Sequence, residues 1–372
     1  MLFTIDRDSL LNKLRIVEKI TIPRGIQPVL ANILFEAADN TLKLSATDLD
    51  LSIITNTMAS VKKEGKITLP AKKILEIISK LPDKPIEFSL NSETNMVTIT
   101  CGNSKFEIIG ISADEFPSLS TEEELATKDS IEIDMTPFVK SIKHTVYAAA
   151  NYENRNIISG VFCNISDDNI EMAATDGNRL TRIRENVKNK NEKTAKIVIP
   201  SKTLQEFLRV SSLISEEKVQ LIVDNAKIII KTKGFLIISR LLEGEYPPYK
   251  QLIPQSTEKT AVISRDDLIK SLELVSCMVN DRTSVIKFVF SEGKLLLKAE
   301  TPDSGASEDI IDAQYEGEEL TIAFNYKYVL DSVKIMESKN TQVGLGGSLS
   351  ATIFRPDSEE DYLCLIMPIQ IR

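Results

Sequence analysis

A short strand followed by an amphipathic helix recurs three times along this chain at nearly equal spacing. The strand residues Ile5, Ile133 and Ile263 align at offsets of 128 and 130, and apolar residues follow each of them at helical spacing. The chain has 372 residues, so each copy is about 124 residues long. The repeat predicts three similar domains in a row, with no single centre for chemistry.

Each copy is predicted to contain two helices. Asp6, Asp134 and Ser264 stand at the aligned start of the first helix, where a side-chain oxygen accepts a hydrogen bond from a free N–H group of the first turn. Pro70 and Pro200 suit the start of the second helix, because the first turn does not use the missing N–H. The predicted helices cover residues 7–19, 70–82, 136–150, 201–214, 264–278 and 325–338.

Alternating, β-rich runs separate the helices. Residues 42–48 match residues 170–176, and residues 295–301 take the same place in the third copy. The sequence therefore predicts an α+β fold of three repeated domains, each with two helices packed on antiparallel sheets. We expect domains at residues 1–120, 128–250 and 258–372, with polar linkers at 118–129 and 251–259.

Composition and cysteine usage narrow the class of protein. With 42% hydrophobic and 27% charged residues, the chain is typical of soluble globular proteins. No run approaches the ~20 apolar residues that span a bilayer, and the amino terminus lacks the layout of a signal peptide. The four cysteines do not have the spacing of a zinc or redox motif, which favours a reducing cytoplasm. They are Cys101, Cys163, Cys277 and Cys364.

Charge is distributed unevenly along the chain. The net charge is −9, but the predicted helices hold 15 Lys and Arg against 9 Asp and Glu, while the remainder holds 30 against 45. Solvated helix faces explain this split without any ligand. A helix-lined positive surface that faces a polyanion explains it equally well, with the outer faces kept negative.

Signals for catalysis are weak. His144 is the one histidine, and its helical spacing after the apolar residue 142 predicts a helix-surface position. Asp48 and Asp50 are predicted on one face of a strand edge, with no histidine partner for a metal. The glycine-rich residues 344–347 lack the lysine of a phosphate-binding loop and are predicted to form a hairpin turn. We therefore expect no enzyme, metal or cofactor.

Two local segments stand out from this background. The run Thr-Asp-Gly-Asn-Arg-Leu at residues 175–180 occurs in the middle copy only. Residues 362–372 form an unusually apolar chain end, of which 362–366 are predicted to be a last strand. Pro368 stops that strand, so Met367 and Ile369 are expected to line a groove for apolar peptides.

The threefold repeat, residues 175–180, the Gly-Glu-Tyr-Pro-Pro-Tyr turn at 244–249 and the Met-Pro ending together resemble the bacterial β sliding clamp family. This family is the processivity subunit of the DNA polymerase III holoenzyme. The resemblance covers the whole chain. It implies a non-catalytic, head-to-tail homodimer that closes a six-domain ring around double-stranded DNA, with twelve helices lining the hole. It also implies a groove for peptides of the replicative polymerase, the clamp loader, repair polymerases and mismatch-repair proteins.

The resemblance also implies the residues of each site. The groove positions are Ile158, Thr175, Gly177, Asn178, Arg179, Leu180, Pro247, Gln251, Leu252, Leu365, Ile366, Met367, Pro368, Ile369, Gln370 and Ile371. The DNA-contacting positions are Arg24, Tyr152 and Arg155, and the subunit-interface positions are Phe106, Cys277 and Met278.

The chain departs from the family pattern at three groove positions. Asn178 stands where histidine is common, Gln251 where a basic residue is expected, and Gln370 where arginine usually follows the Met-Pro-apolar run. Two other classes of protein stay open. One is a repeat adaptor that binds peptides but not DNA. The other is an active nuclease or polymerase subunit, which the lack of clustered carboxylates disfavours.

Overall fold

The helices occur where the repeat predicts them. The computed structural model of the chain describes residues 1–22, 27–119, 128–151, 156–189, 193–279, 284–301, 305–358 and 361–370. Within these residues the α-helices are α1 (Arg7–Val17), α2 (Ala71–Lys80), α4 (Met135–Lys143), α5 (Ser201–Ser211), α6 (Arg265–Ser276) and α7 (Tyr326–Ile335). Two predicted N-caps are confirmed, because Asp6 accepts from the Ser9 N–H and Ser264 from the Asp267 N–H.

The helices are a few residues shorter than predicted, and the largest difference is at the end of α4. α4 ends at Lys143, whereas the pattern extended it to residue 150. The Thr145 hydroxyl donates to the Ser141 carbonyl, and the Thr145 N–H turns to the carbonyl of Ile142, three residues back, so the chain tightens into a 3₁₀ turn. The prediction of a surface position for His144 was wrong: the ring is buried, edge-on to Tyr362 at 4.8 Å.

The first and third repeats hold their helix pairs together in the same way. In each, the first residue of the first helix is an arginine that donates to carbonyls in the last turn of the second helix. Arg7 donates to the carbonyls of residues 78 and 79, and Arg265 to those of 333 and 334. The last carbonyls of a helix have no partner within it, and the negative end of its dipole favours a cation there.

The strands of the described residues form three antiparallel sheets. The five-stranded sheet contains β5 (Ser60–Lys63), β1 (Leu2–Ile5), β7 (Ile86–Asn91), β8 (Met96–Cys101) and β9 (Ser104–Ile109), in that order. The eight-stranded sheet contains β10 (Ile131–Asp134), β15 (Lys218–Asp224), β16 (Lys227–Lys231), β17 (Leu236–Arg240), β4 (Leu51–Met58), β3 (Thr41–Thr47), β2 (Asn32–Ala38) and β6 (Gly65–Pro70).

The third sheet has twelve strands. It contains β14 (Ala195–Pro200), β11 (Gly160–Ile165), β12 (Asn169–Thr175), β13 (Arg179–Asn186), β25 (Tyr362–Ile366), β24 (Thr352–Pro356), β23 (Asn340–Leu345), β18 (Lys259–Ser264), β21 (Gly305–Tyr315), β20 (Lys294–Thr301), β19 (Val285–Ser291) and β22 (Leu320–Asn325). The predicted glycine-rich hairpin is confirmed, because β23 and β24 are antiparallel neighbours.

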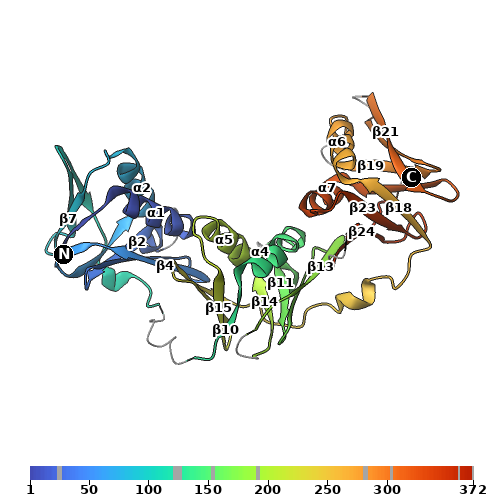
Figure 1. Cartoon of the computed structure of the whole chain (residues 1–372). Coiled ribbons are helices and arrows are strands. Elements are labelled where there is room, and N and C mark those ends of the chain that lie inside the picture. Colours follow the sequence, from blue (N-terminus) through green and yellow to red (C-terminus); the bar gives the residue numbers. More distant parts are fainter. Residues whose placement is uncertain are drawn as a thin grey trace. The chain divides into compact units, whose positions relative to one another are not determined.

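The chain divides into two compact units, and Figure 1 labels the strands and helices that belong to each. The first unit holds residues 1–135 and 206–241, and the second holds 136–205 and 242–372. The division falls inside the middle repeat because its strands pair with both neighbours. β17 of the middle repeat pairs with β4 of the first, and β13 pairs with β25 of the third.

Each unit has its own aromatic core. In the first unit the rings of Phe3 and Phe88 stack at 4.8 Å, and in the second Phe324 packs edge-on to Phe288 and Phe354. No helix among the described residues is long and apolar enough to cross a membrane.

The predicted placement of two aspartates was wrong. Asp48 and Asp50 lie in the turn between β3 and β4 instead of on one face of a strand, and Asp48 Oδ1 accepts from the N–H groups of Asp50 and Leu51. Across the part of the chain that the structure describes, no group of three or more His, Cys, Asp or Glu residues is placed to hold a metal ion.

Candidate functional site

The run at residues 175–180 forms a tightly hydrogen-bonded turn between β12 and β13. The Thr175 hydroxyl donates to the Arg179 carbonyl at 2.6 Å and accepts from the Gly177 N–H at 3.1 Å. Asp176 Oδ1 accepts from the N–H groups of Asn178 and Arg179 at 2.9 and 3.1 Å. Gly177 has φ +90°, a left-handed conformation that glycine adopts without strain. The turn therefore holds Asn178 and Arg179 in one defined arrangement.

Arg179 is the anchor of this turn. Its side chain is only 9% exposed, and its guanidinium contacts Asp176 at 3.1 Å, Asp331 at 2.8 Å and the Tyr147 carbonyl at 2.6 Å. The guanidinium also lies 4.4 Å from the ring centroid of Tyr328, a cation–π arrangement. Burial acts to lower the pKa of Arg179, but the two aspartates more than offset it and raise that pKa. Arg179 thus joins the turn to α7.

Apolar side chains form a floor beside the turn. Leu180 on β13 and Leu365 on β25 are directly opposite each other and buried. Phe162, Ile353 and Tyr249 belong to the same cluster. Because side chains alternate along a strand, the floor occupies one face of the twelve-stranded sheet.

A short 3₁₀ segment, η7 (Tyr249–Leu252), borders this floor. Tyr246 and Tyr249 are buried, with ring centroids 5.6 Å from that of Phe162. On the outer side, Gln251 is exposed and Leu252 is 59% exposed. The segment is thus fixed by its tyrosines and leaves an apolar side chain for a partner.

A buried glutamate holds η7 against the sheet. Glu171 on β12 accepts from the Tyr249 hydroxyl at 2.6 Å, forms an ion pair with Lys250 at 2.7 Å and another with Arg182 at 3.1 Å, and its side chain is 6% exposed. Arg182 continues the network to Asp361 at 2.6 Å. Burial acts to raise the pKa of Glu171, but the hydrogen bonds from Lys250 and Tyr249 and the charge of Arg182 outweigh it and lower that pKa.

The chain end is held on the other side of the turn. β25 ends at Ile366, as Pro368 predicts, and the next N–H, that of Met367, donates to the Asn178 carbonyl at 2.9 Å. The Ile369 N–H donates to the Ala323 carbonyl at 2.8 Å. Met367 is 47% exposed, while Pro368 and Ile369 are half-buried. The end is therefore a fixed, partly apolar wall.

Most predicted groove residues come together around the turn, η7 and the chain end. Pro247 is half-buried before η7, and Gln370 is exposed after the apolar run. Ile158 is half-buried, and its neighbour Ile157 packs against the apolar floor. Ile371 lies outside the described residues, as do all three predicted DNA-contacting residues, Arg24, Tyr152 and Arg155.

Sequence reasoning missed the residues that support the site from other elements. Tyr328 and Asp331 on α7 contact Arg179, and Glu171 holds η7. The spacing of Tyr328 and Asp331 places them on one helix face, which is the one signal available in the sequence. Nothing in the sequence links that face to the turn.

The predicted interface residues lie at open strand edges or beside them. Phe106 is exposed on β9, the edge strand of its sheet, where Ile109 is 68% exposed. In the second unit, β21 pairs with β20 over residues 305–312 but with β18 only from residue 313 onward, so one edge of its first half is unpaired within the described residues. Cys277 is exposed after α6, and Met278 lies beside Gly305 of β21.

Comparison with known proteins identifies the family. Sequence profiles of the N-terminal, central and C-terminal domains of the DNA polymerase III beta subunit match residues 1–120, 132–248 and 250–370. The chain belongs to the DNA polymerase III beta subunit family. It is 32% identical to the beta sliding clamp of Synechocystis sp., covering 98% of each chain. It is 28% identical to the beta sliding clamp of Bacillus subtilis, covering 100% of each chain.

Solved structures agree with this family. The DNA polymerase sliding clamp from Bacillus subtilis has a TM-score of 0.92 at 27% identity, and the DNA polymerase III beta subunit from Thermotoga maritima has a TM-score of 0.91 at 28% identity. Both alignments cover 100% of each chain. The predicted α+β fold of repeated clamp domains is confirmed. Members of this family are non-catalytic, as the sequence predicted.

Proposed function

We propose that this chain encircles duplex DNA as a head-to-tail homodimeric ring. As a member of the beta subunit family it is a processivity clamp of DNA polymerase III. Its domains at residues 1–120, 128–250 and 258–372 would supply three of the six in the ring. A closed ring stays on DNA by topology, so a weakly positive lining is enough and allows sliding.

The observation that carries the polymerase-tethering part of the proposal is the apolar site formed by the 175–180 turn, η7 and the chain end. A buried leucine pair with half-exposed leucine and methionine side chains at its rim suits a short apolar peptide. The replicative polymerase would dock there. Tethering raises the effective concentration of the polymerase at the primer end, so rebinding replaces dissociation.

The same groove would serve further partners in the cytoplasm. We propose that the clamp loader, repair polymerases and mismatch-repair proteins bind it with similar apolar-tipped peptides. The ion pair of Arg179 with Asp331 holds the turn beside the floor, and the exposed rim carries the flexible side chain of Met367. A groove of this kind accepts related peptides that differ in sequence.

Two open strand edges support a head-to-tail dimer. We propose that β9 of one subunit adds to the unpaired edge of β21 in its partner, burying Phe106 and Ile109 against Met278. Replacing Met278 with Asp would place an unpaired charge in this contact, which costs several kcal/mol. We expect Met278→Asp to give folded monomers in light scattering. An unchanged dimer would reject this interface.

The function is tested by comparing DNA topologies. Protein loaded on nicked circular DNA should be retained, whereas on linear DNA of the same length it should run off the ends. The double variant Arg24→Ala with Arg155→Ala should load less well while its circular dichroism spectrum is unchanged. Equal release from both DNA forms would reject encirclement and favour the peptide-binding adaptor.

The groove is tested by removing one wall. Deleting residues 367–372 should abolish binding of a polymerase-derived peptide in calorimetry, because buried apolar anchors carry about 2 kcal/mol or more each. The dimer should persist, since the proposed interface lies on other strands. Gln370→Arg is the matched control, as an exposed rim charge should change affinity little. Undiminished affinity in the deletion would reject the groove assignment.

A further inference from the structure

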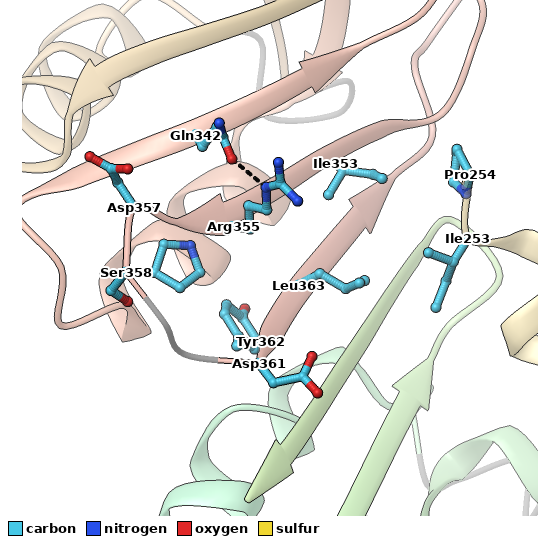
Figure 2. Close-up of a pocket in the computed structure, with 11 residues that line it drawn as sticks. Ile253, Pro254, Gln342, Ile353, Arg355, Asp357, Ser358, Asp361, Tyr362 and Leu363 are labelled. Carbon is cyan, nitrogen blue, oxygen red and sulfur yellow. Dashed lines mark hydrogen bonds between the residues drawn. The ribbon is translucent and has the colours of Figure 1, made fainter. Parts of the chain in front are cut away.

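A second hollow continues from the groove along the same sheet face. It has a volume of about 430 Å³ and lies over β24 and β25 in the second unit. Figure 2 shows Ile353 and Leu363 directed toward Ile253, the residue that follows η7. These three side chains also pack in the apolar floor of the groove. The hollow and the groove therefore share a wall.

The far end of this hollow is polar and carries one guanidinium with free donors. Arg355 on β24 is exposed, and its Nε donates to the side-chain oxygen of Gln342, as drawn in Figure 2. Its two terminal nitrogens have no acceptor among the described residues. A guanidinium presents these donors in a fork that matches a carboxylate.

The nearby carboxylates have other partners. Asp361 is paired through both oxygens with Arg182, at 2.6 and 3.1 Å. Asp357 accepts from the Asn340 side chain at 3.3 Å. Arg355 is therefore the lining residue at this end that offers a ligand charged donors with no acceptor among the described residues.

We infer that this hollow is an extension of the peptide groove that takes an acidic residue flanking the apolar core of a partner peptide, with the carboxylate bound to Arg355. This inference rests on the proposed function of the groove. It gives the clamp a means of ranking partners whose apolar cores are alike, because only those with a suitably placed carboxylate gain the added contact.

Calorimetric titration with five synthetic peptides tests the inference. All share one apolar core from the replicative polymerase, and four add Asp-Asp or Asn-Asn before or after it. One Asp-Asp peptide should bind about fivefold more tightly than its Asn-Asn counterpart, and added salt should reduce the difference. Arg355→Gln should remove this preference while binding the bare core as tightly as the wild type does.

A matched variant separates this contact from general charge. Lys294→Gln removes an exposed positive charge on β20 and should keep the preference. Equal affinity for Asp-Asp and Asn-Asn peptides at both ends, or a preference that survives Arg355→Gln, would overturn the inference and leave the groove intact. If the bare core itself does not bind, the proposed groove fails and the inference fails with it.

Discussion

The chain forms the same turn twice and uses it differently. Residues 47–51 join β3 to β4, and residues 175–179 join β12 to β13. Each turn has five residues, of which the first is threonine and the second aspartate. In both turns the threonine hydroxyl donates to the carbonyl of the fifth residue and accepts from the N–H of the third. The aspartate side chain accepts from the N–H groups of the fourth and fifth residues. The third residue has positive φ in both, +78° at Leu49 and +90° at Gly177.

The two turns differ in the residue at their fifth and last position. In the first repeat it is Leu51, which is buried and lies opposite Ser239 of β17. In the middle repeat it is Arg179, which lies opposite Ile366 of β25 and reaches Asp331 on α7. The first and middle repeats therefore share the backbone conformation of the turn, and the side chain of Arg179 makes the middle turn part of the candidate site.

The largest expected effect comes from replacing Arg179 with leucine, which is the residue at the same position of the first turn (Leu51). Arg179→Leu leaves Asp176 and the Tyr147 carbonyl without their partner and should cost about 3 kcal/mol in the free energy of unfolding. Affinity for a polymerase-derived peptide should fall as well. Urea-induced unfolding and calorimetry measure the two effects. Arg184→Leu, an exposed site on the same strand, should stay within about 0.5 kcal/mol of wild type. A fully stable Arg179→Leu protein would mean that the turns are interchangeable.

The second contrast lies on the strand before each turn. Glu171 holds η7, whereas Lys43 at the aligned position pairs with Glu36 of a neighbouring strand, and both of those side chains are part-exposed. Glu171→Gln weakens charge-assisted bonds and should cost about 2 kcal/mol, with weaker peptide binding. Lys43→Gln should cost under about 1 kcal/mol. Equal losses in urea-induced unfolding would remove the distinction between the two strands.

Lowering the pH should reduce the stability of the protein through the protonation of Glu171. The folded-state pKa of Glu171 is below its ordinary value of 4.5, so its contribution to stability is present above that pH. It is lost as the pH falls below 4.5 through the folded pKa. The stability difference between wild type and Glu171→Gln should therefore shrink between pH 7 and pH 3. A difference that stays constant in urea-induced unfolding at both pH values would contradict the lowered pKa.

The smallest expected effect concerns the third turn position. A Cβ at residue 177 meets no atom within 4 Å, so Gly177→Ala adds only backbone strain, about 1 kcal/mol. Leu49→Gly removes that strain in the first turn but adds freedom to the unfolded chain, so the net change should be a few tenths of a kcal/mol. Thermal unfolding of the pair measures both. A larger loss for Leu49→Gly than for Gly177→Ala would show that Leu49 packs in a way the turn geometry does not require.

The sequence by itself determined the repeat, the positions where the helices begin, two of their N-caps, the hairpin between β23 and β24 and the end of the last strand before Pro368. These depend on periodicity and on bonds between near neighbours, such as Asp6 with the Ser9 N–H. It also placed the 175–180 run and the chain end in one site, through the resemblance to a family.

Only the tertiary structure decided which residues support that site. Arg179 meets Asp331 across 152 positions in the chain, and Tyr249 meets Glu171 across 78. It also buried His144 against Tyr362. Pairing of β13 with β25 brings Arg179 to the repeat that carries Asp331, and no local pattern encodes which distant strand becomes the neighbour.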